Sequence, residues 1–140
     1  LHNNRHSFPT RRSSDLLSWS ELDEILTAVK AAGINGLIAT NTTLSRDGLQ
    51  SGLREEAGGL SGRPLTARST EIIAYIARQM GSRLPIVGVG GVQTAVDVQA
   101  KLDAGASLVQ VYTGLVYGGP GIAGTILRQL ATASQATNPE

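Results

Sequence analysis

Apolar residues recur at intervals of three and four along four segments of the chain, which is the spacing of an amphipathic helix. The first segment opens with Ser18 and Glu21, a capping-box pair, and reaches a natural stop at Gly33. The third opens with a similar pair, Thr94 and Asp97. The expected apolar stripes are Leu22, Ile25, Leu26 and Val29 in the first helix, Ile72, Ile73, Ile76 and Met80 in the second, Val98 and Leu102 in the third, and Ile122, Ile126 and Leu130 in the fourth.

Short apolar runs at 34–40, 84–91 and 107–114 alternate with these helices and predict three buried strands. Strands that alternate with helices build a parallel sheet. Three strands cannot close a (β/α)8 barrel, which takes about eight strands and about 250 residues. We therefore expect an α/β unit with three parallel strands, either a small open sheet or the back half of a larger barrel.

The composition narrows the classes of function. Removing the first 16 residues takes the formal net charge from +1 to −1, with nine basic and ten acidic residues left, so no basic surface for nucleic acid is expected. The chain has no cysteine, which excludes disulfides and thiolate metal sites. Its two histidines, His2 and His6, lie in the polar opening stretch, and we expect no metal site. No apolar run approaches the ~20 residues of a membrane span. A soluble protein in a reducing compartment fits these features best.

Each expected strand ends in residues suited to ligand binding, and ligands of parallel α/β folds bind at this edge of the sheet. "GVGG" and "YTG" follow two successive strands and each precedes a helix, as in the phosphate site of phosphate-binding barrels. A Cβ at Gly90 or Gly91 would keep a phosphate from the backbone amides, so we predict a phosphate at this turn. The alternative is a tight turn that needs glycine for its own geometry. The segment "GVGGVQ" lacks the third glycine of the dinucleotide-binding motif G-x-G-x-x-G, which argues against a dinucleotide site.

The first strand ends in Asn41 and Thr42, neutral hydrogen-bonding groups that suit a planar polar ligand. On spacing alone, a solvent-exposed turn explains Asn41 and Thr42 slightly better than a binding site does. A glycine-rich connection at 44–66 follows. A loop of this length without periodicity is usually functional, and we expect it to close part of the pocket.

Four blocks, "IATNTTLSR", "EEAGGLSGRPLTARSTEII", "LPIVGVGGV" and "AGASLVQVYTGLVYGGP", resemble in order and spacing the C-terminal part of class 2, quinone-dependent dihydroorotate dehydrogenase. The resemblance covers roughly residues 18 to 130. It implies the C-terminal portion of an FMN-dependent (β/α)8 barrel that oxidises dihydroorotate to orotate in pyrimidine biosynthesis and passes electrons to ubiquinone. It also implies a peripheral membrane location for the complete protein, through N-terminal helices that have no counterpart in this chain.

The resemblance assigns roles to eight residues. The FMN would contact the first strand end, the long connection and the two later strand ends, and the substrate pyrimidine would lie beside the first strand. The FMN contacts would be Thr40, Gly62, Gly90, Gly91, Tyr112 and Thr113, and the substrate contacts would be Asn41 and Thr42.

The opening of the chain departs from the family. The catalytic serine of the family lies on an upstream loop, and "FPTRRSS" stands where the family has a strand with a flavin-contacting lysine. We expect residues 1–15 to be a polar tail foreign to the family, 16–132 to be the partial FMN-binding barrel, and 133–140 to be a polar tail. Alone, the chain would then be inactive, with no catalytic base, and its exposed strand edges would favour self-association or aggregation. The alternative function is a non-catalytic half-barrel that binds FMN or another phosphate ligand.

Overall fold

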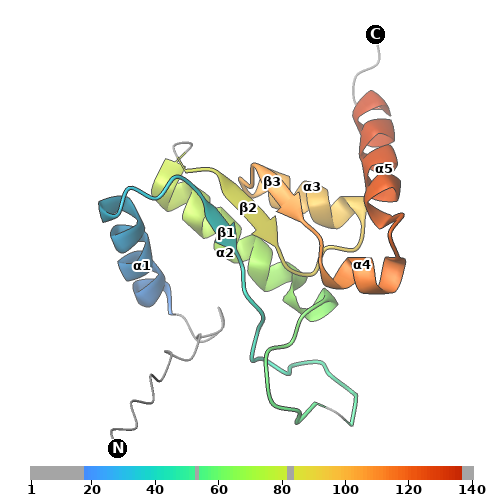
Figure 1. Ribbon diagram of the computed structural model, residues 1–140, viewed down its shortest axis with the longest axis horizontal. Coiled ribbons are helices and arrows are strands. Elements are labelled where there is room, and N and C mark those ends of the chain that lie inside the picture. Colours follow the sequence, from blue (N-terminus) through green and yellow to red (C-terminus); the bar gives the residue numbers. More distant parts are fainter. Residues whose placement is uncertain (1–17, 53, 82–83, 137–140) are drawn as a thin grey trace, which may run out of the picture.

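The computed structural model describes residues 18–52, 54–81 and 84–136, which form an α/β unit around a three-stranded parallel sheet (Figure 1). The strands lie in the order β1-β2-β3, and both neighbouring pairs are parallel. The elements are α1 (Trp19–Ala31), β1 (Leu37–Ala39), the 3-10 helix η2 (Arg63–Leu65), α2 (Thr66–Met80), β2 (Ile86–Val89), α3 (Ala95–Asp103), β3 (Leu108–Gln110), α4 (Thr113–Gly118) and α5 (Ile122–Ala136).

Both predicted capping boxes are present. The Ser18 hydroxyl accepts from the Glu21 amide at 3.2 Å, and the Glu21 carboxylate accepts from the Ser18 amide at 2.8 Å. Thr94 and Asp97 repeat this arrangement at the start of α3. These caps satisfy backbone N–H groups that the first helical turn leaves without partners, which fixes where the two helices begin.

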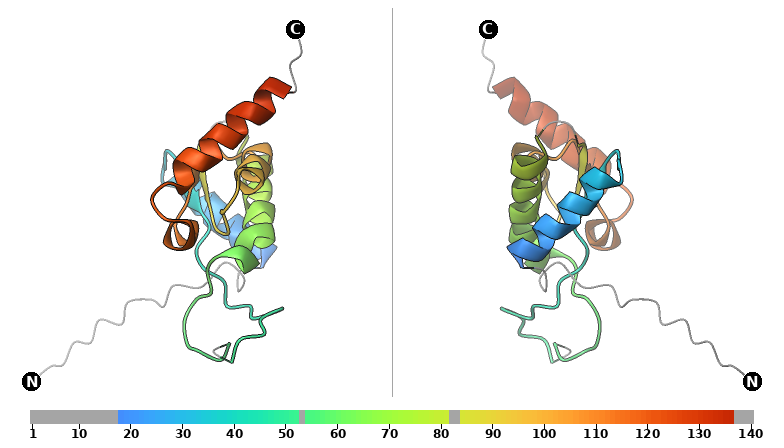
Figure 2. Two further views of the ribbon diagram at one scale, coloured as in Figure 1. Left: turned by 90° about the vertical axis from the view of Figure 1, so that its right-hand side faces the viewer. Right: turned by 90° about the vertical axis from the view of Figure 1, so that its left-hand side faces the viewer.

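Helix α2 packs along one face of the sheet, with α1 beside it (Figures 1 and 2). Ile73 on α2 and Ile86 on β2 are almost completely buried at the centre of this layer. A second cluster forms where α3 meets α5, around Val98 and Ile126. The alternation of helices and parallel strands that the sequence predicts is therefore confirmed, and the helices pack against one face of the sheet.

The opposite face of the sheet is largely uncovered by the described residues. Ile38, Val87 and Leu108 share one register across the three strands, and Ile38 and Leu108 are 69% and 65% exposed. Two residues predicted on buried helical stripes, Ile25 and Leu102, are also exposed, at 42% and 36%, so that part of the prediction is wrong. In the part of the chain that the structure describes, the sheet is thus open, with one packed face and one face of exposed apolar side chains.

The strands are shorter than predicted, and α4 was not predicted. Helix α5 continues to Ala136, inside the segment 133–140 expected to be a polar tail. The opening segment 1–15, with His2 and His6, lies outside the described residues. No helix in the described part of the chain is both long and apolar enough to cross a membrane.

Candidate functional site

A pocket of about 310 Å³ lies at the carboxyl ends of the three strands. All eight residues singled out in the sequence line it. The complete lining is Ile38, Thr40, Asn41, Thr42, Ser61, Gly62, Leu65, Val89, Gly90, Gly91, Val92, Gln110, Tyr112, Thr113 and Gly114. Residues as far apart in the sequence as Ile38 and Gly114 therefore meet at one site, because parallel strands end at the same edge of a sheet.

The β1 end carries the first polar group of the pocket. The Thr40 amide donates to the Val89 carbonyl at 2.9 Å, which ties this end to β2. The Thr42 amide donates to Asn41 Oδ1 at 2.9 Å. Among the described residues, nothing accepts a hydrogen bond from Asn41 Nδ2, and the Asn41 side chain is exposed. Asn41 therefore offers amide donors to the pocket.

The turn at Gly90 and Gly91 needs glycine for a reason within the protein itself. Gly91 is buried and has a φ of +70°, and a Cβ there would lie 2.6 Å from both N and Cα of Thr66. The first turn of α2 therefore packs directly against the Gly91 backbone. Within the described residues, the amide N–H groups of Gly90 and Gly91 meet no hydrogen-bond acceptor. The close packing explains the glycine, and the two amides are left as available donors.

The third strand end contacts the long connection. Thr113 Oγ1 donates to Ser61 Oγ at 2.9 Å, and a Cβ on Gly62 would lie 3.3 Å from Thr113 Cγ2. A Cβ on Gly114 would overlap the carbonyl oxygen of Val92, so the turns after β2 and β3 also touch. The pocket walls thus support one another.

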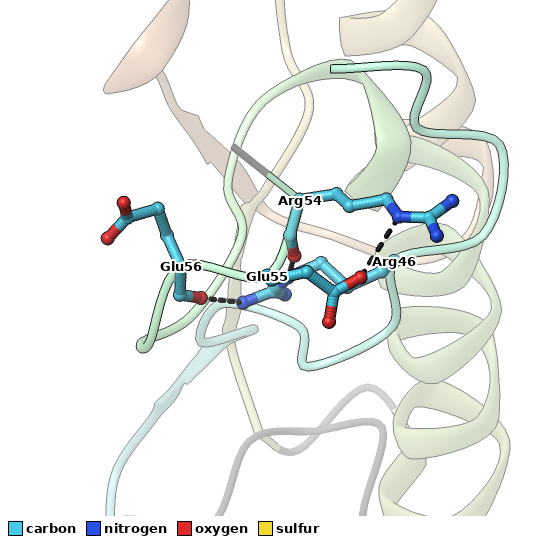
Figure 3. A network of polar contacts seen from close by, with 4 residues as sticks. All are labelled: Arg46, Arg54, Glu55 and Glu56. Atoms are coloured by element: carbon cyan, nitrogen blue, oxygen red, sulfur yellow. Dashed lines mark hydrogen bonds and ion pairs between the residues drawn. The ribbon is translucent and has the colours of Figure 1, made fainter. Parts of the chain in front are cut away.

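The long connection is ordered by backbone pairing and by one arginine. Thr43, which is 3% exposed, pairs with Leu60 through two backbone hydrogen bonds of 2.9 and 2.7 Å. Beyond this pair, the Arg46 guanidinium donates to the carbonyl oxygens of Arg54 at 3.0 Å and Glu56 at 3.2 Å (Figure 3). The base of the connection is therefore fixed where Ser61 and Gly62 enter the pocket. No sequence pattern marked Arg46 for this role.

The described residues that line the pocket are all uncharged. Among the described residues, the buried charged side chain is Lys101 on α3, which has no exposed surface and donates to α2. Burial lowers the pKa of Lys101 to about 8, and the negative charge of Asp97 partly opposes this shift. In the sequence Lys101 resembles an ordinary surface lysine, so it was missed. No group of three potential metal-ligating side chains occurs among the residues that the structure describes.

Comparisons with known proteins agree with this arrangement. The profile of the family described as Dihydroorotate dehydrogenase matches residues 13–133. A curated protein from a Cyanothece species named dihydroorotate dehydrogenase (quinone) is 50% identical over 127 residues, covering 85% of this chain and 34% of that protein. One of the same name from Akkermansia muciniphila is 56% identical over 108 residues, covering 76% of this chain and 30% of that protein.

Solved structures give the same result. The ligand-free dihydroorotate dehydrogenase of Eimeria tenella superposes with a TM-score of 0.81 at 38% identity, covering 86% of this chain and 34% of that one. The chain belongs to the dihydroorotate dehydrogenase family, and the Cyanothece and Akkermansia relatives carry the name dihydroorotate dehydrogenase (quinone). It spans about a third of the length of those relatives. The prediction of a three-stranded parallel portion of this fold is confirmed.

Proposed function

We propose that the pocket at the strand ends is the FMN and substrate site of a quinone-dependent dihydroorotate dehydrogenase, and that this chain supplies the phosphate-binding side of it. The observation that carries the proposal is the convergence of all eight residues implied by the resemblance on one pocket. The names of the curated relatives give the reaction class.

The donor chemistry of the pocket fits a phosphate monoester. The available N–H groups of Gly90 and Gly91 and the polar groups of Tyr112 and Thr113 come from two adjacent strand ends. The Thr113 hydroxyl, which donates to Ser61 Oγ in this structure, would turn to donate to a phosphate oxygen. Backbone amides and hydroxyls bind phosphate oxygens without requiring a positive charge in the pocket. These four residues would hold the phosphate, while Thr40 and Gly62 would contact the remainder of the flavin.

The substrate would lie beside the end of β1. Asn41 Nδ2 and the Thr42 hydroxyl are neutral groups that would bind the carbonyl, N–H and carboxylate edges of dihydroorotate. When bound, FMN supplies the two-electron redox chemistry of such enzymes. The residues of this chain bind and orient both molecules, and the connection at 60–62 shields one side of the pocket. In the complete protein a quinone would be the electron acceptor, and contact with a membrane would come from segments outside this chain.

A titration of the purified chain with FMN, followed by flavin fluorescence, tests the cofactor site. Thr113→Val removes one pocket hydroxyl while keeping the side-chain shape, and we expect it to weaken FMN binding about tenfold, the effect of one hydrogen bond to a charged group. Thr27→Val is the matched control, because Thr27 lies on the exposed face of α1 and its hydroxyl donates only to the Asp23 carbonyl. The proposal fails if wild type does not bind FMN, or if both variants bind it equally well.

Orotate tests the substrate site. Adding orotate to the FMN-loaded chain should perturb the flavin absorbance, and Asn41→Leu should abolish this change while FMN remains bound. If the chain binds FMN but orotate has no effect, the result supports the alternative of a half-barrel that binds a flavin or another phosphate ligand without the substrate.

A further inference from the structure

Lys101 is a buried cation that does not line the pocket. Its side chain has no exposed surface, and its Nζ donates to Ser69 Oγ at 2.9 Å and to Thr70 Oγ1 at 3.2 Å. Among the described residues, no carboxylate forms an ion pair with it. A buried ammonium held only by neutral groups is costly to desolvate, so its place in this core calls for an explanation.

The hydrogen bonds of Lys101 have a fixed direction. An ammonium can only donate, so each hydroxyl accepts from it and directs its own proton elsewhere. Ser69 Oγ donates to the Val89 carbonyl at 2.7 Å, and Thr70 Oγ1 donates to the Thr66 carbonyl at 2.9 Å. Lys101 thereby sets the orientation of both hydroxyls.

The Ser69 branch of these bonds leads to the glycine turn. Val89 directly precedes Gly90, and its carbonyl also accepts the Thr40 amide at 2.9 Å. On the other side of the turn, Thr66 Oγ1 lies 2.9 Å from the Gly91 carbonyl and 2.8 Å from the Arg63 carbonyl, and its one proton is shared between these two acceptors. The Val89 carbonyl therefore joins the turn after β2 to the polar segment after β1.

The aliphatic stem of Lys101 has a separate packing role. A Cβ on Gly88 would lie 3.3 Å from Lys101 Cδ, so the stem fills space directly below β2. A methionine could fill most of the same space, since it is unbranched and similar in length. Only the ammonium distinguishes lysine in the hydrogen-bonded chain that leads to Val89.

We propose that Lys101 is a positioning residue for the phosphate of the ligand: through Ser69 it fixes the Val89 carbonyl, and so aims the Gly90 and Gly91 amides into the pocket. This inference rests on the proposed function and adds to it a group outside the pocket that tunes affinity for the phosphate. With a pKa of about 8, Lys101 is mostly protonated at neutral pH, as the direction of its hydrogen bonds requires. Asp97, on the same helix, is the charged group that favours this protonated form.

The test compares FMN with riboflavin, which lacks the phosphate. Dissociation constants for both are measured by flavin fluorescence with wild type, Lys101→Met and Ser69→Ala, under conditions where circular dichroism shows each to be folded. We expect both variants to bind FMN about tenfold more weakly and to bind riboflavin within about twofold of wild type. Ile76→Val, a core change away from the pocket, is the control for general destabilisation and should alter the two constants by the same factor.

The outcomes separate this inference from the proposed function. If wild type binds FMN no more tightly than riboflavin, the phosphate site itself is wrong, and the role of Lys101 is wrong with it. If wild type prefers FMN and both variants keep that preference, the phosphate site stands and the positioning role is refuted. Equal weakening of FMN and riboflavin also refutes it, because a merely structural residue gives that result. If Lys101→Met does not fold, Ser69→Ala decides alone, since it removes one hydroxyl from the same chain of hydrogen bonds.

Discussion

Replacing Gly91 with alanine tests directly how the turn after β2 is built. Gly91 has a φ of +70°, and an added Cβ would lie 2.6 Å from two backbone atoms of Thr66. Gly33, just past the end of α1, is a matched control. Its φ is +64°, and a Cβ there would meet nothing within 4 Å. The two substitutions therefore share the conformational cost and differ in the steric cost.

The expected magnitudes follow from these two costs. A non-glycine residue in the left-handed region costs about 1–2 kcal/mol, which is the whole effect expected for Gly33→Ala. Overpacking costs about 1–3 kcal/mol more, and at Gly91 the opposing atoms are the backbone of α2, which cannot move without moving the helix. Gly91→Ala should thus lower the free energy of unfolding by about 2–5 kcal/mol.

Urea unfolding followed by far-ultraviolet circular dichroism measures both values. We expect Gly91→Ala to be clearly less stable than Gly33→Ala, with similar m-values. Equal losses would show that the contact between the turn and Thr66 is absent in solution, and would refute the packing explanation for this glycine.

Three further predictions concern charged groups. Because the pKa of Lys101 is about 8 in the folded chain and 10.5 ordinarily, the unfolded state binds more protons between these values. The free energy of unfolding of the wild type should therefore rise with pH across that window, by up to about 1.4 kcal/mol per pH unit more than that of Lys101→Met. Urea unfolding at several pH values measures this, and the same pH dependence in wild type and variant would contradict it. Arg46→Met should speed limited proteolysis within 44–59 several-fold, while Arg54→Met, which alters an exposed side chain, should not; equal rates would exclude the ordering role of Arg46. Asp97→Ala removes an acceptor for the Gln93 and Thr94 amides, so it should lower the free energy of unfolding by about 1–2 kcal/mol, measured by urea unfolding. An unchanged free energy of unfolding would show that this cap does not stabilise the fold.

Structural features that depend on residues close together in the sequence were predicted correctly. The pairs Ser18–Glu21 and Thr94–Asp97 lie three residues apart, so the cap each forms can be read from a short window. The pocket was also predictable, because strand order places the polar ends of parallel strands together. Helix α4 was missed because six residues that include two glycines are too few to show a helical period.

Features that depend on distant segments could not be predicted. Gly91 meets Thr66, 25 positions away, so this packing contact was hidden, and the sequence suggested only a bound phosphate or a tight turn as reasons for the glycine. Lys101 meets Ser69 across 32 positions, and nothing around it in the sequence distinguishes it from a surface lysine. Ile25 matches a buried helical stripe but borders a part of the sheet that the described residues leave open.

The central claim is that the strand ends bind the phosphate of FMN, and amide chemical shifts test it most directly. Two-dimensional NMR spectra of the isotopically labelled chain are recorded with FMN and with riboflavin. We expect the amide signals of Gly90, Gly91 and Thr113 to shift with FMN and to shift far less with riboflavin, while those on the exposed face of α1 stay in place. Equal shifts with both ligands, or shifts confined to other parts of the chain, would contradict it.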